Sequence, residues 1–483
     1  MNSKSEAMNI PINGRVAIVE NNYEEAKPLM SLFAKHQIPY VYYTGDLSEL
    51  PSREASTNDI RLLFLDLNLV SDKGSVLSSG GQIGHLKRVL KSIIKDDNYP
   101  YAIILWSISE DNELAEQLIS VEPLAQQLTN AFASDLSNAR PIATMDLRKS
   151  DYMNKDYDVE SGKHTVSIIE ANIPKLFDSI KQLLNQEPAF GYLLNWENKV
   201  HSSADSTLQG IFQTVPTVDW KANANYLLNK LGNSYSGKHF YGQTPSDKLK
   251  SSMNALNIVF TDTLEANVNH ETIADAIELD GSGATPDALS TINTKLLISN
   301  ETEPRNYPGM ALLCGSAHEN HFKTLSNELL NVADLRVEAL NVPNSNTLEE
   351  PAKKKLINEK LSAARTQIRL TWKQIYLNTT PLCDFVQKKV CHDRLILGAL
   401  VAADTIHLVD DKSESIYVSP KFDWGGIVVH LVLHFRFLFT LDTNHVEPDT
   451  TAIFRVRQQL LAEIQSKLAR HVSRQGVLFL DER

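Results

Sequence analysis

IRLLFLDLNLV, residues 60–70, is an apolar run that contains one carboxylate, Asp66. The aliphatic and aromatic residues before Asp66 are typical of a buried strand. Because an unpaired buried charge is costly, a lone Asp inside such a strand needs an explanation. Two arrangements provide one. Either a core strand ends at Asp66, or Asp66 belongs to a functional site at the carboxyl end of the strand.

Strand-like runs and helical patterns alternate around this segment, which predicts an α/β fold. The expected strands are 15–20 (RVAIVE), 38–45 (IPYVYYTG), 60–67, 101–107 (YAIILWS) and 140–149 (RPIATMDLRK). The expected helices are 21–36, 81–97, 112–132 and 171–186. Such alternation favours a doubly wound, five-stranded parallel sheet with helices on both faces, and ligand sites in these sheets gather at the carboxyl ends of the strands.

Polar side chains occur where these strands are expected to end, in AIVENN, LLFLDLNL, IILWS and MDLRKSD. They are Glu20, Asn21, Asp66, Ser107 and Lys149. Their order along the chain resembles that of the receiver domain of two-component response regulators, which has a flavodoxin-like fold. The resemblance covers about the first 187 residues.

The resemblance implies a role for each position. Asp66 would accept a phosphoryl group, and Glu20 and Asn21 would be the metal pair, holding Mg²⁺ together with Asp66. The Ser107 hydroxyl would bond the phosphoryl oxygens, and Lys149 would pair with them. The chemistry fits these residue types, because phosphoryl transfer needs an ionised acceptor and a cation that neutralises the developing charge.

Three departures from the receiver pattern weaken the phosphorylation chemistry. Asn21 stands where the family usually has a second metal-binding Asp, and a Mg²⁺ site depends on such charges. Lys149 is not followed by Pro, and about twenty residues separate it from the next expected helix. We therefore expect a divergent receiver-like domain. Asp66 is then a phosphoacceptor, a structural carboxylate or part of a cleft with a different use, and an Asp66–Lys149 ion pair is expected in each case.

Bulk composition predicts a multidomain cytoplasmic protein. The chain has 483 residues, 42% of them hydrophobic, a net charge of −12 and three cysteines. This cysteine content favours a reducing compartment, and no segment resembles a secretory signal or a membrane span. We expect three domains: a receiver-like domain (1–187), a mainly helical domain (188–380) and a C-terminal α+β region (381–483) that ends in an amphipathic helix.

The cysteines and nearby histidines are alternative site residues. Cys383 and Cys391 lie eight residues apart near His392, and Cys314 lies near His318 and His321. Structural zinc sites normally use paired short spacings, which are missing here. Buried or partly buried thiols are the ordinary explanation, but a metal site or an enzyme that uses Cys383 as nucleophile is also considered.

Basic residues gather on two expected helices. Lys467, Arg470 and Arg474 lie near the C-terminal end of the last helix, and Lys353, Lys354 and Lys355 lie on an earlier one. Cations are favoured at helix C-termini by the helix dipole, which is a structural explanation for the first group. The functional alternative is a regulator that binds nucleic-acid phosphates through these helices.

TPLCDFVQKK (380–389), followed by RLILGAL, IYVSPKF and LHFRFLF, is similar to receiver-like proteins encoded in bacterial conflict and phage-defence islands. That resemblance implies a degenerate receiver joined to a large C-terminal region, acting beside a kinase, ATPase or nuclease partner. We find no phosphate-binding loop, nucleophile elbow or metalloprotease motif. The expected function is therefore a non-enzymatic signalling or adaptor protein, and the resemblance implies a role in anti-phage defence.

Overall fold

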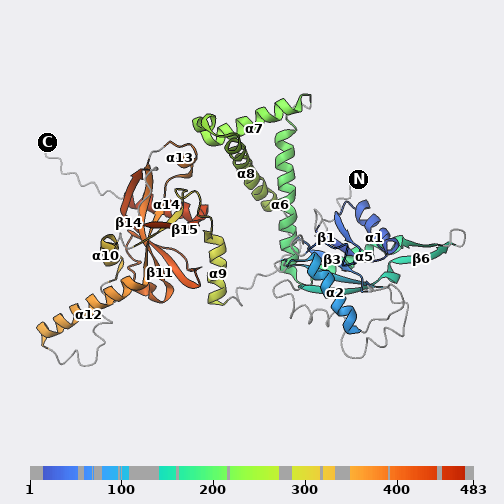
Figure 1. Cartoon of the computed structure of the whole chain (residues 1–483), viewed down its shortest axis with the longest axis horizontal. Helices are drawn as coiled ribbons and strands as arrows, with labels where there is room; N and C mark the ends of the chain where they lie inside the picture. The colour runs from blue at the N-terminus through green and yellow to red at the C-terminus, as the bar shows by residue number, and fades with distance from the viewer. Residues whose placement is uncertain are drawn as a thin grey trace. The chain divides into compact units, whose positions relative to one another are not determined.

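The computed structural model contains two compact units. It describes residues 15–52, 59–67, 69, 79–95, 98, 100–107, 141–158, 163–214, 218–270, 285–315, 319–331, 349–389, 392–442 and 449–473. The first unit comprises Met1–Trp220 with Leu256–Glu278, and the second comprises Lys221–Ala255 with Leu279–Arg483 (Figure 1).

A five-stranded parallel sheet forms the centre of the first unit. Its strands are β1 (Val16–Val19), β2 (Tyr40–Tyr43), β3 (Leu62–Leu65), β4 (Ala102–Ser107) and β5 (Ala143–Arg148). Their order is β2-β1-β3-β4-β5, and every neighbouring pair is parallel. The predicted parallel α/β sheet is confirmed. The order changes direction at β1 and β3, which is where ligands usually bind in open sheets of this kind.

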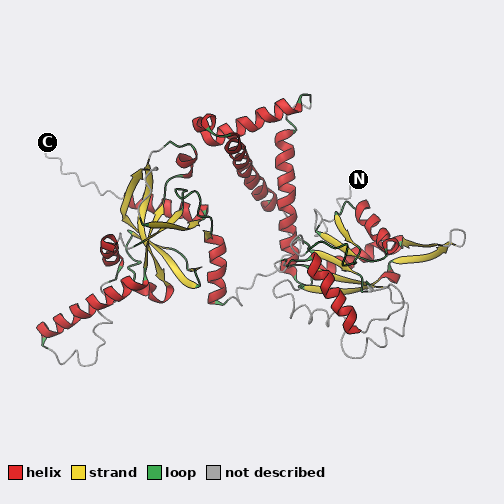
Figure 2. Ribbon diagram, viewed as in Figure 1, coloured by secondary structure: helices red, strands yellow, loops and turns green. Residues whose placement is uncertain are grey.

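The central strands β1, β3 and β4 are buried on both faces of the sheet, and each is a continuous apolar run (Figure 2). On one face Val16, Ile18 and Phe64 pack with α1 (Tyr23–Lys35) and α5 (Ile173–Leu184). On the other face Leu63 and Leu65 pack with α2 (Ser79–Ile93). Alternate residues of one strand thus serve different cores, as the two-residue period of a strand requires.

Several details of this unit differ from the sequence-based expectations. Pro28 lies in the second turn of α1 and not in its first turn. The segment between Lys149 and α5 forms an unpredicted antiparallel hairpin, β6 (Met153–Asp158) and β7 (Lys163–Ile168), flanked by short 3₁₀ helices η2 (Lys149–Asp151) and η3 (Glu170–Asn172). The helix expected over 112–132 lies outside the described residues.

The middle of the chain is helical, as predicted. Its elements are α6 (Pro188–Phe212), α7 (Trp220–Ser236), η4 (Gly237–Gly242), α8 (Pro245–Asn269) and α9 (Pro286–Leu297). None of the helices that the structure describes combines the length and apolar character needed to span a bilayer.

An antiparallel sheet of eight strands organises the second unit. Its main order is β12-β14-β11-β10-β9-β15-β8, with β13 paired to β14. The strands are β8 (Ile298–Ser299), β9 (Met310–Cys314), β10 (Lys373–Asn378), β11 (His392–Ala402), β12 (Ile416–Val418), β13 (Phe422–Trp424), β14 (Ile427–Asp442) and β15 (Thr450–Val456). The helices are α10 (Glu319–Leu329), α12 (Glu350–Thr371), α13 (Leu382–Val386), η7 (Ala403–Leu408) and α14 (Gln458–Val472).

Two strands of this unit adjoin helices whose spacing of residues they continue. Ile368, Trp372 and Ile375 are spaced as on one helix face, but α12 ends at Thr371 and Ile375 lies in β10. Phe454, just before the last helix, lies in β15. In both cases the strand pairs with two neighbouring strands, and this pairing overrides the local helical period.

A substitution at Gly398 in β11 tests how closely β11 packs against β14. An added Cβ there would lie 2.4 Å from the Val432 carbonyl oxygen of β14. We expect Gly398→Ala to lower the free energy of unfolding by about 2 kcal/mol or more, because backbone must move. Gly242→Ala is the control, since its Cβ meets no described atom within 4 Å. Equal urea midpoints for the two variants would contradict the strand register.

Candidate functional site

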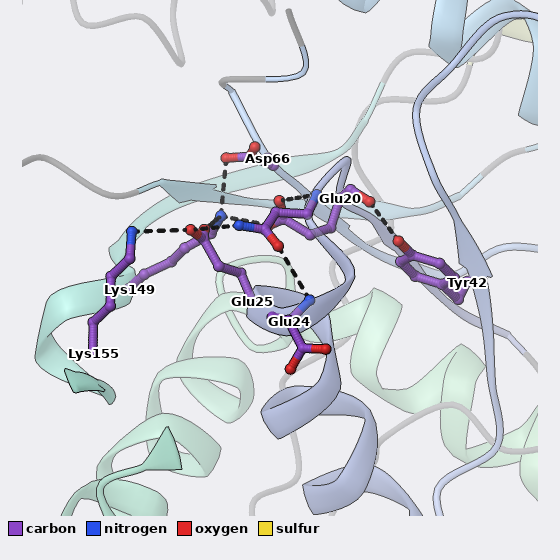
Figure 3. Close-up of polar contacts among 8 residues, drawn as sticks. Glu20, Glu24, Glu25, Tyr42, Asp66, Lys149 and Lys155 are labelled. Atoms are coloured by element: carbon purple, nitrogen blue, oxygen red, sulfur yellow. Dashed lines mark hydrogen bonds and ion pairs between the residues drawn. The ribbon is translucent and has the colours of Figure 1, made fainter. Parts of the chain in front are cut away.

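Three of the predicted site residues meet at the carboxyl edge of the parallel sheet (Figure 3). Glu20 directly follows β1, Asp66 directly follows β3, and Lys149 begins η2 directly after β5. Backbone hydrogen bonds fix the first two positions: the Glu20 N–H donates to the Tyr43 carbonyl (3.0 Å) and the Asp66 N–H to the Val19 carbonyl (2.9 Å). The parallel strands therefore deliver the side chains to one place.

The Lys149 ammonium is surrounded by three carboxylates. It donates a hydrogen bond to Glu20 Oε2, and it lies 3.0 Å from Glu25 Oε2 and 3.2 Å from Asp66 Oδ1. Glu20, Asp66 and Lys149 are each at most 2% exposed, and Glu25 is 8% exposed. We call these four residues the Lys149 cluster. The expected Asp66–Lys149 ion pair is present, and it is part of a larger buried network.

Glu25 is a site residue that strand-end reasoning missed. It lies in the first turn of α1, where it is buried beside Leu29 and Leu32. Its Oε1 accepts a hydrogen bond from Asn22 Nδ2 (3.1 Å) and lies 3.4 Å from Lys155 Nζ. One sequence signal could have found it: Glu25 precedes Leu29 by four and Leu32 by seven residues, so a carboxylate occupies the apolar stripe of the helix.

Asn22 supports the cluster from the loop after β1. The Asn22 N–H donates to Glu20 Oε1, and the Asn22 side chain caps α1 by accepting from the Glu24 N–H, both at 3.1 Å. Asn21, the expected second metal-binding position, is exposed. The cap positions the first turn of α1, and with it Glu25, against Lys149.

Burial and charge shift the pKa values of the cluster in opposite ways. Burial, and after it the charge of Asp66, raises the pKa of Glu20 from 4.5, and Lys149 lowers it; the net result is a pKa of about 8. Burial alone lowers the pKa of Lys149, but the charges of Asp66 and Glu20 outweigh it and hold that pKa above its usual value. Lys149 is therefore charged at neutral pH, and Glu20 holds a proton more readily than an exposed carboxyl does.

Magnesium binding by Glu20 and Asp66 stays a prediction, and the donor set does not fit it in this arrangement. Both carboxylates are directed at the Lys149 ammonium, which lies between them. Across the part of the chain that the structure describes, no three His, Cys, Asp or Glu side chains are arranged to hold a metal ion. A cation would first have to displace Lys149.

Ser107 ends β4, next to this edge of the sheet. It is in register with Arg148, the residue directly before Lys149. Its assignment as the hydroxyl of a receiver site stays a prediction.

The cysteine candidates are not brought together into a described site. Cys383 is an exposed free thiol on α13, and its sulfur lies 3.7 Å from Asp384 Oδ1. Cys314 is a partly buried free thiol at the end of β9, and His392 is exposed at the start of β11. Cys391 and His318 lie outside the described residues. The metal and nucleophile hypotheses gain no support from these positions.

Lys467, one of the basic residues of the last helix, has structural partners. Lys467 Nζ lies 3.2 Å from Glu463 Oε1 and 4.6 Å from the centre of the Tyr417 ring. Arg470 lies in the last turn of α14, where the helix dipole favours a cation, and Arg474 lies outside the described residues. Leu460, Leu461 and Ile464 of α14 are buried against the sheet. Nucleic-acid binding through these residues stays a prediction.

Lys149→Met tests whether the ammonium stabilises the first unit. It should lower the free energy of unfolding by about 3–5 kcal/mol, since it leaves buried carboxylates without their shared cation. Adding Asp66→Asn should restore part of the loss, because it removes one of those charges. Chemical denaturation measures both effects. Lys27→Met on the exposed face of α1 is the control, and a Lys149→Met effect no larger than that of this control would refute the account.

The raised pKa of Glu20 predicts a pH dependence. The folded protein holds a proton that the unfolded chain releases near pH 4.5, so stability from this group is full at lower pH and is lost as pH rises through about 8. Denaturation midpoints of the first unit should therefore fall between about pH 5 and 9. Glu20→Gln should flatten this slope, whereas Glu24→Gln should not. A slope unchanged by Glu20→Gln would show that another group is responsible.

Comparison of the chain with protein-family profiles, with curated proteins and with solved structures found no match. The resemblance to receiver domains therefore depends on the order of residues along the sequence. The geometry at the edge of the sheet is compatible with that resemblance, and the family assignment stays a prediction.

Proposed function

We propose that the chain is a non-enzymatic signalling or adaptor protein built on a degenerate, doubly wound receiver-like domain. The observation that carries this proposal is the Lys149 cluster, in which residues from the ends of β1, β3 and β5 meet. The strand order β2-β1-β3-β4-β5 supports it, because this order is that of flavodoxin-like folds.

The chemistry of the cluster favours an architectural role over phosphoryl transfer. An acceptor carboxylate must be ionised, aligned for in-line attack and assisted by a bound cation. Asp66 is instead 2% exposed and paired with Lys149, and the ammonium also engages Glu20 and Glu25. Asn21 provides no charge for a metal. The retained groups therefore hold the strand ends together, and the domain acts as a sensing or docking module.

The helical middle and the C-terminal sheet would then transmit the state of this module to a protein partner. A kinase, an ATPase or a nuclease of a bacterial defence system is the class of partner that the sequence resemblance implies. The alternative of nucleic-acid binding is less well supported, because Lys467 is engaged by Glu463 and Tyr417.

Incubation with acetyl phosphate and Mg²⁺, followed by intact-mass analysis, tests the degenerate receiver. We expect no phosphoryl adduct on the wild-type chain, whereas an active receiver treated in parallel should gain one. The Asp66→Asn variant distinguishes phosphorylation of Asp66 from phosphorylation of other residues. A phosphoryl gain in the wild type that is absent in Asp66→Asn would contradict the proposal and establish an active phosphoacceptor.

A further inference from the structure

The β6–β7 hairpin is an addition to the parallel sheet, and its strand β7 packs against α1. It forms a separate two-stranded sheet, and Figure 1 shows it extending beyond the body that contains α1 and α5. A two-stranded hairpin is marginally stable in water without further packing. Small changes in the contacts between the hairpin and the rest of the first unit should therefore change the stability of the hairpin measurably.

Apolar packing holds the base of the hairpin. Met153 is buried in the same core as α1 and α5, and Val166 and Ile168 pack against that core. Tyr152, just before β6, stacks on Trp106 of β4 with ring centres 5.7 Å apart. These contacts fix where the hairpin begins, but Asn154 and Asp156, farther along β6, are exposed.

A single carboxylate connects the hairpin to the Lys149 cluster. Glu25 Oε2 lies 3.0 Å from Lys149 Nζ, and Glu25 Oε1 lies 3.4 Å from Lys155 Nζ on β6 (Figure 3). The Glu25 side chain is about 10% exposed and the Lys155 side chain 36% exposed. The Glu25 carboxylate is largely shielded from water, so charges near it are weakly screened. A change in the charge around Lys149 therefore changes the strength of the Glu25–Lys155 ion pair.

The charges of the cluster also act on Lys155 directly. Three carboxyl groups, those of Glu20, Glu25 and Asp66, surround the single ammonium of Lys149. Lys155 is the cation on the hairpin side of this group. A loss of negative charge in the cluster should therefore weaken the attraction that holds β6 against α1.

We propose that the Glu25–Lys155 ion pair couples the β6–β7 hairpin to the charge of the Lys149 cluster, and that the hairpin is the element through which the cluster's state is expressed. Glu25 acts here as a positioning residue, because it works through Lys149 and Lys155. The inference builds on the proposed signalling role of the same site and identifies its regulated element.

Hydrogen exchange measured by mass spectrometry can test this coupling. The Ile169 N–H donates to the Tyr152 carbonyl (2.8 Å), so by antiparallel alternation the amides of Asn154, Asp156, Thr165 and Ser167 point between the two strands. Peptides that contain these amides report opening of the hairpin. A peptide that covers β3 reports opening of the central sheet and serves as the internal reference.

Asp66→Asn should accelerate exchange in the hairpin peptides by about two- to fivefold relative to the reference, the scale of one partly exposed ion pair. In a Lys155→Met background the same substitution should have no such effect, because the hairpin then carries no charge at this contact. Glu25→Gln should accelerate exchange, and Glu24→Gln, next to it but exposed, should not.

An equal effect of Asp66→Asn with and without Lys155 would overturn the coupling, as would no effect in the wild-type background. The experiment uses no phosphodonor. A phosphoryl gain at Asp66 would therefore contradict the degenerate receiver without changing this result, and the two proposals fail separately.

Discussion

The first unit depends on one buried cation. Lys149 brings its ammonium to the carboxyl edge of a parallel sheet, where Glu20, Glu25 and Asp66 surround it. Each of these charges would be costly to bury alone, so each requires the others. These ion pairs hold four segments in place relative to one another: the loop after β1, the first turn of α1, the end of β3 and the start of η2. The cluster lies where the strand order changes direction, at β1 and β3.

The cluster has more acid than base, and this imbalance determines its properties. Burial, and next the repulsion from Asp66, raises the pKa of Glu20, while the charges of Asp66 and Glu20 keep Lys149 charged. A receiver uses a similar edge to bind a metal and a phosphoryl group. Here the ammonium already occupies the position between the acids, and the additional acid, Glu25, is shared with Lys155 of the hairpin.

Most of the site could be predicted from the sequence because three of its residues lie directly after strands. Glu20, Asp66 and Lys149 each follow an apolar run, and the carboxyl ends of parallel strands meet at one edge. Glu25 escaped because it lies on a helix, where the signal is a charge within an apolar stripe. The β6–β7 hairpin escaped because MNKDYD and KHTVSI are mostly polar and lack a clear strand pattern.

In the second unit a clear local sequence pattern predicts the wrong secondary structure. Ile368, Trp372 and Ile375 are spaced as on a helix, yet the chain becomes extended at Trp372 and continues as β10. Pairing of β10 with both β9 and β11 decides the outcome, and such long-range pairing is not encoded in the period of one segment.

The central claim is that the Lys149 ammonium is charged and hidden from water between carboxylates. Proton–nitrogen NMR of the lysine ammonium groups tests this claim directly, with Lys149→Met to assign the signal. The account predicts a Lys149 ammonium resonance that persists from neutral to alkaline pH, because its protons exchange slowly with water, whereas exposed Lys27 gives none. Exchange at Lys149 as fast as at Lys27 would contradict it.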